Sequence, residues 1–301
     1  MISIIIPTYN RAHLIGETLD SVIAQTYENW ECIMVDDGST DYTDELMEFY
    51  CKKDPRIQYC HRPQDRLKGP NACRNYGYEL SKGKFINWLD SDDLLSQNKL
   101  EEQLWLLEHK QADIAICKWG ILKHNEIKIF QNLPSYNSFC CSRAFLKAVF
   151  ESHGYFPPHI YLITRKIIDK TGLWNEHLQI NQDGEYMIRL ICNSSRFYFA
   201  DKGYGLYRQG GEKRVSLINS ENVLDYYNSW KLIENYLKIR FKEDIPEFEN
   251  VKRQAFTRIP EKLSYVYLQD NPFFFDLLKM KNEERIVNKI RRFVKRALSK
   301  L

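Results

Sequence analysis

Apolar and polar residues follow a regular order over the first third of the chain. Residues 2–6, four Ile and one Ser, form a short, mostly β-branched apolar run, which predicts a strand buried on both faces. Apolar residues between positions 14 and 23 then recur at helical spacing. The same order continues to residue 117, with strands predicted at 30–35, 57–60, 84–89 and 113–117 and helices around 46–49, at 71–80 and at 98–108. Strands that alternate with helices indicate an α/β fold, with a mostly parallel central sheet and helices on its faces.

The pattern changes in the rest of the chain. The alternation weakens over residues 135–216, where frequent aromatic residues would form a wall facing a second substrate. A helical pattern over 223–240 precedes shorter segments broken by prolines. We therefore expect residues 1–95 and 96–218 to be two halves of one domain, and residues 219–301 to be a helical extension.

Composition and charge narrow the class of protein. Of the 301 residues, 44% are hydrophobic and 28% are charged, which suits a sizeable packed core. The net charge of +3 does not favour nucleic acid as a partner. The eight cysteines form no Cys-x-x-Cys pair, and no apolar stretch approaches the ~18 residues that span a bilayer. We therefore expect reduced thiols and a cytoplasmic location.

The C-terminal segment is markedly basic. Residues 279–301 contain nine Lys or Arg against two Glu, which leaves a net charge of −4 for the rest of the chain. Within 284–301, apolar residues three and four apart form one helical face and basic residues crowd the remainder. This pattern is expected of a helix lying in an anionic membrane surface, on the inner face of the cell membrane. A helix packed on the body, or a contact in a homo-oligomer, would give the same pattern.

Two acidic clusters follow predicted strands. Because ligands of open α/β sheets bind outside the carboxyl ends of the strands, we expect Asp36-Asp37 and Asp90 to Asp93 to face one crevice. Asp90 and Asp92 could hold a hard divalent cation, Mn²⁺ or Mg²⁺, and the adjacent Asp93 would be repelled by both without one. The alternative is that Ser91 or Asp92 caps a helix beginning at Leu94.

The segment 36–41 allows two readings. Asp36 and Asp37 could accept hydrogen bonds from a nucleotide base and a ribose hydroxyl. Equally, the segment could be a turn at Gly38 followed by a helix capped by Ser39 or Thr40. The sequence has no glycine-rich phosphate loop, so a metal ion would have to bind the phosphates of a nucleotide ligand.

Taken together, four blocks resemble the inverting family 2 glycosyltransferases of the GT-A fold. They are residues 3–11, 35–41, 72–75 with two following glycines, and 88–93, and their order and spacing also match over about a third of the chain. A later block at 181–186, with Arg189 six residues beyond Asp183, resembles the Glu-Asp block of this family. Gln182 stands where Glu is usual.

The resemblance implies a role for particular residues. Pro7, Thr8, Tyr9 and Asn10 would line the nucleotide pocket, and Asp37 would read the base beside Asp36. Asp90 would approach the ribose, Asp92 would ligate the metal with Asp90 as its neighbour, and Arg74 and Ser91 belong to the same donor-binding blocks. Asp183 would be the catalytic base, and we expect its place at a helix start to lower the pKa of its carboxyl.

One departure from the family pattern concerns the region after Tyr207. Many relatives carry a His there that completes the metal site or touches the diphosphate, whereas residues 207–216 contain none. Arg208, Lys213 and Arg214 could neutralise the diphosphate charge instead. Gly210-Gly211 would let this loop close over the donor.

The resemblance implies a metal-dependent inverting hexosyl- or N-acetylhexosaminyltransferase, with a UDP-sugar as the favoured donor. Residues 1–95 would bind the donor and metal, and residues 96–218 a glycan or lipid-linked glycan acceptor, as in bacterial surface polysaccharide assembly. A non-catalytic sugar-nucleotide-binding or scaffold protein would be expected to have lost Asp92 or Asp183. A sugar nucleotidylyltransferase would be expected to carry a basic glycine-rich loop after the first strand, and a dehydrogenase the nicotinamide fingerprint.

Overall fold

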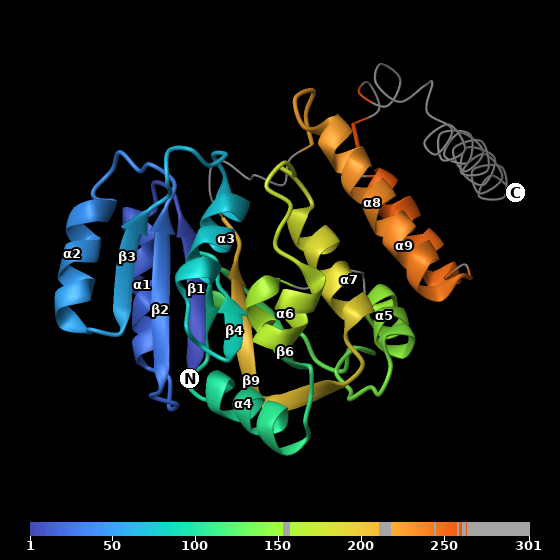
Figure 1. The fold of residues 1–301 in the computed structure, drawn as a ribbon, viewed down its shortest axis with the longest axis horizontal. Coiled ribbons are helices and arrows are strands. Elements are labelled where there is room, and N and C mark those ends of the chain that lie inside the picture. The colour runs from blue at the N-terminus through green and yellow to red at the C-terminus, as the bar shows by residue number, and fades with distance from the viewer. Residues whose placement is uncertain (153–156, 211–217, 244, 258, 261–262, 264–301) are drawn as a thin grey trace, which may run out of the picture.

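The computed structural model of the chain describes residues 1–152, 157–210, 218–243, 245–257, 259–260 and 263 (Figure 1). Lys213, Arg214 and the basic segment 284–301 lie outside the described residues. The described part is an α/β structure built on one central sheet, as the sequence predicts.

The first half of the sheet is wholly parallel. Its strands are β1 (Ile2–Thr8), β2 (Trp30–Asp36), β3 (Ile57–His61) and β4 (Phe85–Trp88), in the order β3-β2-β1-β4. Every residue of β1, β2 and β4 is buried, because helices cover both faces of these strands and exclude water from them. All four strands predicted in this region are confirmed to within two residues.

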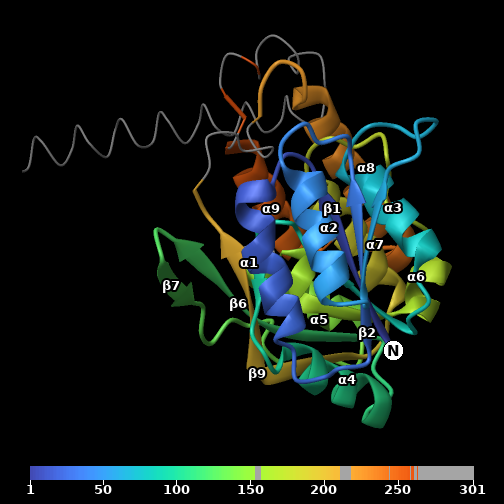
Figure 2. The same ribbon diagram turned by 90° about the vertical axis from the view of Figure 1, so that its left-hand side faces the viewer.

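Helices from both halves of the chain cover the sheet. The helices α1 (Ala12–Ile23), α2 (Thr43–Lys53) and α4 (Lys99–His109) lie on one face, where α1 and α2 stand in front of the strands in Figure 2. The helix α3 (Pro70–Leu80) packs on β1 and β2 from the other face. There it contacts a core formed with α6 (Arg165–Thr171) and α7 (Gln182–Asn193).

Beyond β4 the sheet becomes mixed. β8 (Tyr161–Thr164) runs antiparallel to β4 and to β6 (Ile114–Lys123), while β6 and β9 (Phe197–Arg208) are parallel. β5 (Leu94–Leu95) pairs with β9, and β7 (Glu126–Ile129) pairs with β6. The expected parallel arrangement therefore describes the first four strands, and the pairing beyond them is largely antiparallel.

Three further helices form a layer beside α7. They are α5 (Ser142–Glu151), α8 (Val223–Phe241) and α9 (Pro246–Thr257), whereas the short 3₁₀ helix η1 (Pro158–Ile160) contacts the strands β4, β6 and β9. α8 packs on α7, and α5 contacts both α7 and α9, so buried side chains of α8 belong to the same core as the sheet. Within the described residues, no helix is long and apolar enough to cross a membrane.

Candidate active site at the carboxyl edge of the sheet

The loop Asp90–Asp93 follows β4 at the carboxyl edge of the parallel strands. The backbone N–H of Asp93 donates to the carbonyl of Asp90 at 3.1 Å, which closes a tight turn. The chain then enters β5, and the next helix begins only at Lys99. The alternative in which Ser91 or Asp92 caps a helix at Leu94 is therefore wrong.

Residues from four other elements hold this loop. Ser91 accepts a hydrogen bond on its carbonyl from Thr18 Oγ1 at 3.1 Å, and Asp92 accepts one on its carbonyl from Arg208 Nε at 2.8 Å. The remaining two residues use their carboxylates: Arg74 donates to Asp90 at 2.7 Å, and Asp93 lies 2.8 Å from His159 Nδ1. The loop is thus fixed independently of any ligand.

Among the described residues, the carboxylate of Asp92 has no basic partner as close as Arg74 is to Asp90. Its side chain is 32% exposed, and Arg11 Nε lies 3.8 Å from its Oδ2. Burial raises the pKa of Asp92 to about 7, with further increases from the charges of Asp93 and Asp90. A divalent cation would remove this repulsion, and the oxygen ligands of Asp90 and Asp92 suit Mg²⁺ or Mn²⁺.

Asp93 does not join this pair of oxygen ligands. Its side chain is fully buried, and its Oδ1 accepts the backbone N–H of Arg208. Within the described residues, no group of three or more His, Cys, Asp or Glu is arranged to hold a metal. A cation on Asp90 and Asp92 would therefore share its coordination with ligand phosphates, as Mg²⁺ usually does in proteins.

Asp183 is brought to the same edge by the start of α7. It is the second residue of that helix, as predicted, and its Oδ1 lies 3.9 Å from Arg74 Nη2. Arg74 is 3% exposed and stacks over the ring of Trp174 at 4.4 Å, and its Nη2 lies between Asp183 and Asp90.

The predicted lowering of the Asp183 pKa is wrong. Burial raises the pKa of its carboxyl to about 6, although the positive charge of Arg74 opposes this increase. The side chain lies against the protein interior, and its Oδ1 has no hydrogen-bond partner among the described residues. Here the loss of solvation outweighs the favourable end of the helix dipole.

The predicted nucleotide segment, residues 7–10, lies where β1 ends, at the same carboxyl edge of the sheet. Pro7 and Thr8 are buried in β1, and the Thr8 carbonyl accepts the backbone N–H of Asp37. Tyr9 is 43% exposed, and Asn10 turns the chain with a φ of 52°, a left-handed conformation that Asn tolerates. The Asn10 side-chain oxygen accepts the backbone N–H of Thr40 and ties this turn to the end of β2.

The two carboxylates after β2 have different surroundings. Asp36 is fully buried and accepts hydrogen bonds from the backbone of Gly38 and Ser39 and from the Ser39 hydroxyl, so it shapes its own loop. The predicted contact of Asp36 with a nucleotide is not supported by this arrangement. Asp37 is paired through Oδ1 with Arg62 Nε on the strand side of the site.

The alternative in which Ser39 or Thr40 caps the next helix is wrong. α2 begins at Thr43, and neither Ser39 nor Thr40 caps it. Asp41 instead accepts hydrogen bonds from the backbone of Thr43 and from Ala12, the first residue of α1. The segment therefore links the starts of two helices.

Arg208 lies beside the acidic loop, where its guanidinium contacts other protein groups, and its predicted contact with the diphosphate stays a prediction. Besides its contact with Asp92, its guanidinium donates to Glu17 Oε2 at 2.7 Å, and its side chain is 14% exposed. It therefore supports the loop from the end of β9. Arg189, from the later family block, pairs with Glu185 and donates to the carbonyls of Thr171 and Leu173.

The sequence pattern gives no signal for Arg62 and His159, whereas Arg11 belongs to the first family block and Trp174 to the aromatic stretch 135–216. Only the folded chain places Arg62 and His159 at the acidic residues and Trp174 against Arg74.

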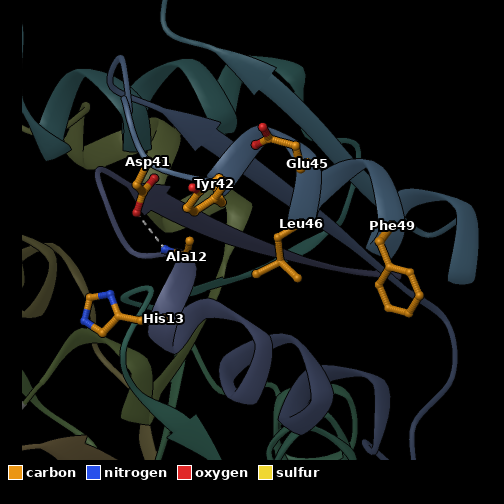
Figure 3. Close-up of a pocket in the computed structure, with 7 residues that line it drawn as sticks. All are labelled: Ala12, His13, Asp41, Tyr42, Glu45, Leu46 and Phe49. Carbon is orange, nitrogen blue, oxygen red and sulfur yellow. Dashed lines mark hydrogen bonds between the residues drawn. The ribbon is translucent and has the colours of Figure 1, made fainter.

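A separate hollow of about 630 Å³ lies between α1 and α2 (Figure 3). Its lining residues are Ala12, His13, Asp41, Tyr42, Glu45, Leu46 and Phe49. The residues of the acidic edge are not among them, so this hollow is not the candidate active site.

The protein has a GT-A-type α/β fold, and carboxylates line the carboxyl edge of its parallel strands. Residues 3–172, more than half of the chain, match the model of glycosyl transferase family 2. The chain therefore belongs to glycosyl transferase family 2.

Curated relatives agree with this family. An uncharacterized glycosyltransferase of Rickettsia bellii is 50% identical over 107 residues, which cover 36% of this chain and 15% of the relative. The glycosyltransferase GlyG of Streptococcus pneumoniae is 26% identical over 218 residues, covering 69% of this chain and 71% of the relative. The match spans only 15–17% of the length of the Rickettsia bellii, felis and conorii relatives.

Solved structures share the fold. TarS 1–349 of S. aureus in complex with UDP has a TM-score of 0.64 at 20% identity, covering 90% of this chain and 74% of that chain. The mannosyltransferase PcManGT of Pyrobaculum calidifontis, in complex with GDP-Man and Mn²⁺, has a TM-score of 0.55 at 15% identity, covering 94% of this chain and 75% of that chain.

Proposed function

We propose that the protein is a metal-dependent inverting glycosyltransferase that moves a sugar from a nucleotide-sugar donor to an acceptor hydroxyl. The observation that carries the proposal is the bridge formed by Arg74, whose Nη2 lies 2.7 Å from Asp90 and 3.9 Å from Asp183. Arg74 thus contacts both Asp90, in the proposed donor-binding loop, and Asp183, the proposed base, at the edge of the sheet where Asp92 lies.

Asp183 is suited to the role of general base. With a pKa of about 6, its carboxylate is mostly ionised at neutral pH and is still basic enough to accept the proton of an attacking hydroxyl. The acceptor oxygen forms the new bond to the anomeric carbon as the bond to the nucleoside diphosphate breaks, and this single displacement inverts the anomeric centre. Only one carboxylate is needed at that carbon, in contrast to hydrolases with paired acids.

Asp92 and Asp90 would hold the divalent cation, which supplies positive charge next to the departing diphosphate. Asp90 would also approach the ribose, with Ser91 beside it. PcManGT, which shares the fold, was solved in complex with Mn²⁺. The carboxylate oxygens of Asp90 and Asp92 are suitable ligands for the same ion.

The favoured donor is a UDP-sugar, with a hexosyl or N-acetylhexosaminyl group to transfer. Arg62 engages Oδ1 of Asp37, which leaves Oδ2 to accept the ring N–H of uracil. Pro7 to Asn10 would line the base pocket, and TarS, with the same fold, is known in complex with UDP and with UDP-GlcNAc. Lys213 and Arg214, outside the described residues, remain proposed diphosphate contacts.

The acceptor would be a glycan or lipid-linked glycan of a bacterial surface polysaccharide pathway. Residues 96–218 would bind it, in a cytoplasmic enzyme held at the inner face of the membrane by the basic segment 284–301. This part of the proposal rests on the sequence pattern of that segment and on the family.

Replacing the proposed base tests the function directly. A panel of nucleotide sugars with Mn²⁺ identifies the donor from metal-dependent hydrolysis. Asp183→Asn should then abolish transfer while the Kd for UDP stays within about twofold, because the base touches the acceptor and not the nucleotide. Asp225→Asn, which changes an Asp in the first turn of α8, is the matched control and should retain activity. Unimpaired transfer by Asp183→Asn would remove that residue from the mechanism.

A further inference from the structure

His159 is a fully buried histidine in contact with the acidic loop. It lies in η1, more than sixty residues beyond Asp93 in the sequence, and both side chains have no exposed surface. His159 Nδ1 is 2.8 Å from Asp93 Oδ2, so the imidazole faces the carboxylate that does not join Asp90 and Asp92 as a cation ligand.

Asp93 connects the loop to two other parts of the sheet. Its backbone N–H closes the turn onto the Asp90 carbonyl, and its Oδ1 accepts the backbone N–H of Arg208 at 2.9 Å. Arg208 in turn holds the carbonyl of Asp92. Asp93 is therefore tied to the same short backbone segment that carries Asp92.

His159 is itself held firmly from two sides. Asn87, three residues before Asp90 on β4, donates through Nδ2 to the carbonyls of His159 at 2.9 Å and Tyr161 at 2.7 Å. On the other side the imidazole lies against Gly205 of β9, where an added Cβ would come within 2.2 Å of His159 Cδ2. A glycine is thus required at residue 205 for the ring to occupy its place.

We propose that His159 is a positioning residue for the cation-binding loop, fixing Asp93 so that the carboxylate of Asp92 faces the donor side. The inference rests on the proposed metal-dependent function. Because Asp90, Asp92 and Asp93 repel one another, a loop without this anchor would relax by turning the carboxylates apart. The contact of Asp93 with His159 keeps Asp93 inside the protein and leaves Asp90 and Asp92 as a preformed pair of oxygen ligands.

Three variants test the role of His159. His159→Leu removes the polar contact, and His159→Asn keeps a nitrogen close to the position of Nδ1. Gly205→Ala leaves the imidazole in the chain but pushes the ring away from its place. Leu237→Ala, in the core of α8 away from the loop, is the control for a general loss of stability.

The measurement is the Kd for Mn²⁺ in the presence of UDP, by titration calorimetry on the full chain, together with the Kd for UDP without metal and the melting temperature. We expect His159→Leu and Gly205→Ala to weaken Mn²⁺ binding by about tenfold or more, the usual effect of losing a residue that supports a metal ligand. The metal-free Kd for UDP should change less than twofold. His159→Asn should restore most of the affinity for Mn²⁺, and Leu237→Ala should lower only the melting temperature.

Other results overturn the inference. If Gly205→Ala and a folded His159→Leu bind Mn²⁺ like the wild type, or if His159→Asn rescues nothing, His159 has only a structural role. If His159→Leu does not fold, Gly205→Ala and His159→Asn decide by the same criteria. A wild-type protein that binds no Mn²⁺ with UDP would refute the proposed metal dependence as well, which separates that failure from a failure of the positioning role alone.

Discussion

Replacing Arg74 with Gln should move the pH dependence of sugar transfer to higher pH. The base form of Asp183 is the ionised one, and its pKa of about 6 reflects burial that raises it and the charge of Arg74 that lowers it. Arg74→Gln keeps much of the side-chain volume and removes the charge. The pKa of Asp183 must then rise, and the acid limb of the profile must rise with it.

The size of the effect follows from the geometry. Two unit charges 3.9 Å apart interact by about 4 kcal/mol at an effective dielectric constant near 20, and one pKa unit corresponds to about 1.4 kcal/mol. Arg74 is shared with Asp90 at 2.7 Å, and the Asp183 side chain is 20% exposed, so only part of this energy acts on Asp183. We expect a shift of about one to two pH units, which would lower the ionised fraction at pH 7 from about 90% to about 25% for a shift of one and a half units.

The assay is the pH profile of kcat/KM for transfer between pH 5 and 9, with Arg74→Lys as the variant that keeps the charge. Asp92, with its pKa of about 7, titrates in the same range and would affect metal binding. A limb caused by Asp92 moves to lower pH as the Mn²⁺ concentration rises, because the metal competes with the proton. The limb caused by Asp183 stays in place at saturating Mn²⁺.

An Arg74→Gln variant that keeps the acid limb of the wild type at saturating Mn²⁺ would contradict this expectation. An Arg74→Lys variant whose limb moves as far as that of Arg74→Gln would contradict it as well, because the shift would then come from altered packing beside Trp174 and not from the lost charge.

Three further expectations concern the metal, the nucleotide and the C-terminal segment. Asp92→Asn should lower turnover by orders of magnitude, while raising the melting temperature of the metal-free protein at pH 8 by about 2 °C in calorimetry. The reason is that the pKa of Asp92 is higher in the folded than in the unfolded state, so the metal-free protein loses stability as pH rises from about 4 to about 7. The loss is about 1 kcal/mol because the side chain is about one-third exposed. UDP should raise the melting temperature more than GDP or ADP. A clearly larger increase with GDP or dTDP would contradict the role of Asp37. Truncation before residue 284 should abolish flotation with anionic liposomes and preserve donor hydrolysis, and a full-length chain that does not float at low salt would contradict the membrane hypothesis.

The first half of the fold was predictable because three of its four strands are buried on both faces. Such strands are largely apolar, so β1, β2 and β4 could be located from local sequence alone. β5 has only two residues, and its pairing of Leu94 with Leu206 joins positions more than a hundred residues apart. No local pattern predicts a strand of that kind, and the sequence left open a helix from Leu94 as an alternative.

The candidate site was predictable to the extent that motifs specify strand ends. The places of Asp90, Asp92 and Asp183 follow from the family blocks, and the structure brings Asp90 and Asp183 to one arginine. The burial of Asp36 and the raised pKa of Asp183 depend on how distant segments pack in the folded chain. Tertiary burial reversed the sign that the helix position of Asp183 had suggested.

The basic partners at this edge suggest why two carboxylates in particular carry the chemistry. Asp37 is paired closely with Arg62, and Asp93 faces His159 at 2.8 Å, each with a partner of its own. Asp90 and Asp183 share Arg74, with Asp183 the more distant, and Asp92 has only Arg11 at 3.8 Å among the described residues. The nearest basic partners are therefore most distant at Asp92 and Asp183, whose pKa values are raised to about 7 and about 6, while burial also raises the pKa of Asp93. A cation bound at Asp92 would relieve that lack of close positive charge, and so would a proton taken by Asp183 from the acceptor. The two carboxylates that the proposed reaction uses are therefore among those whose ionised form the fold disfavours.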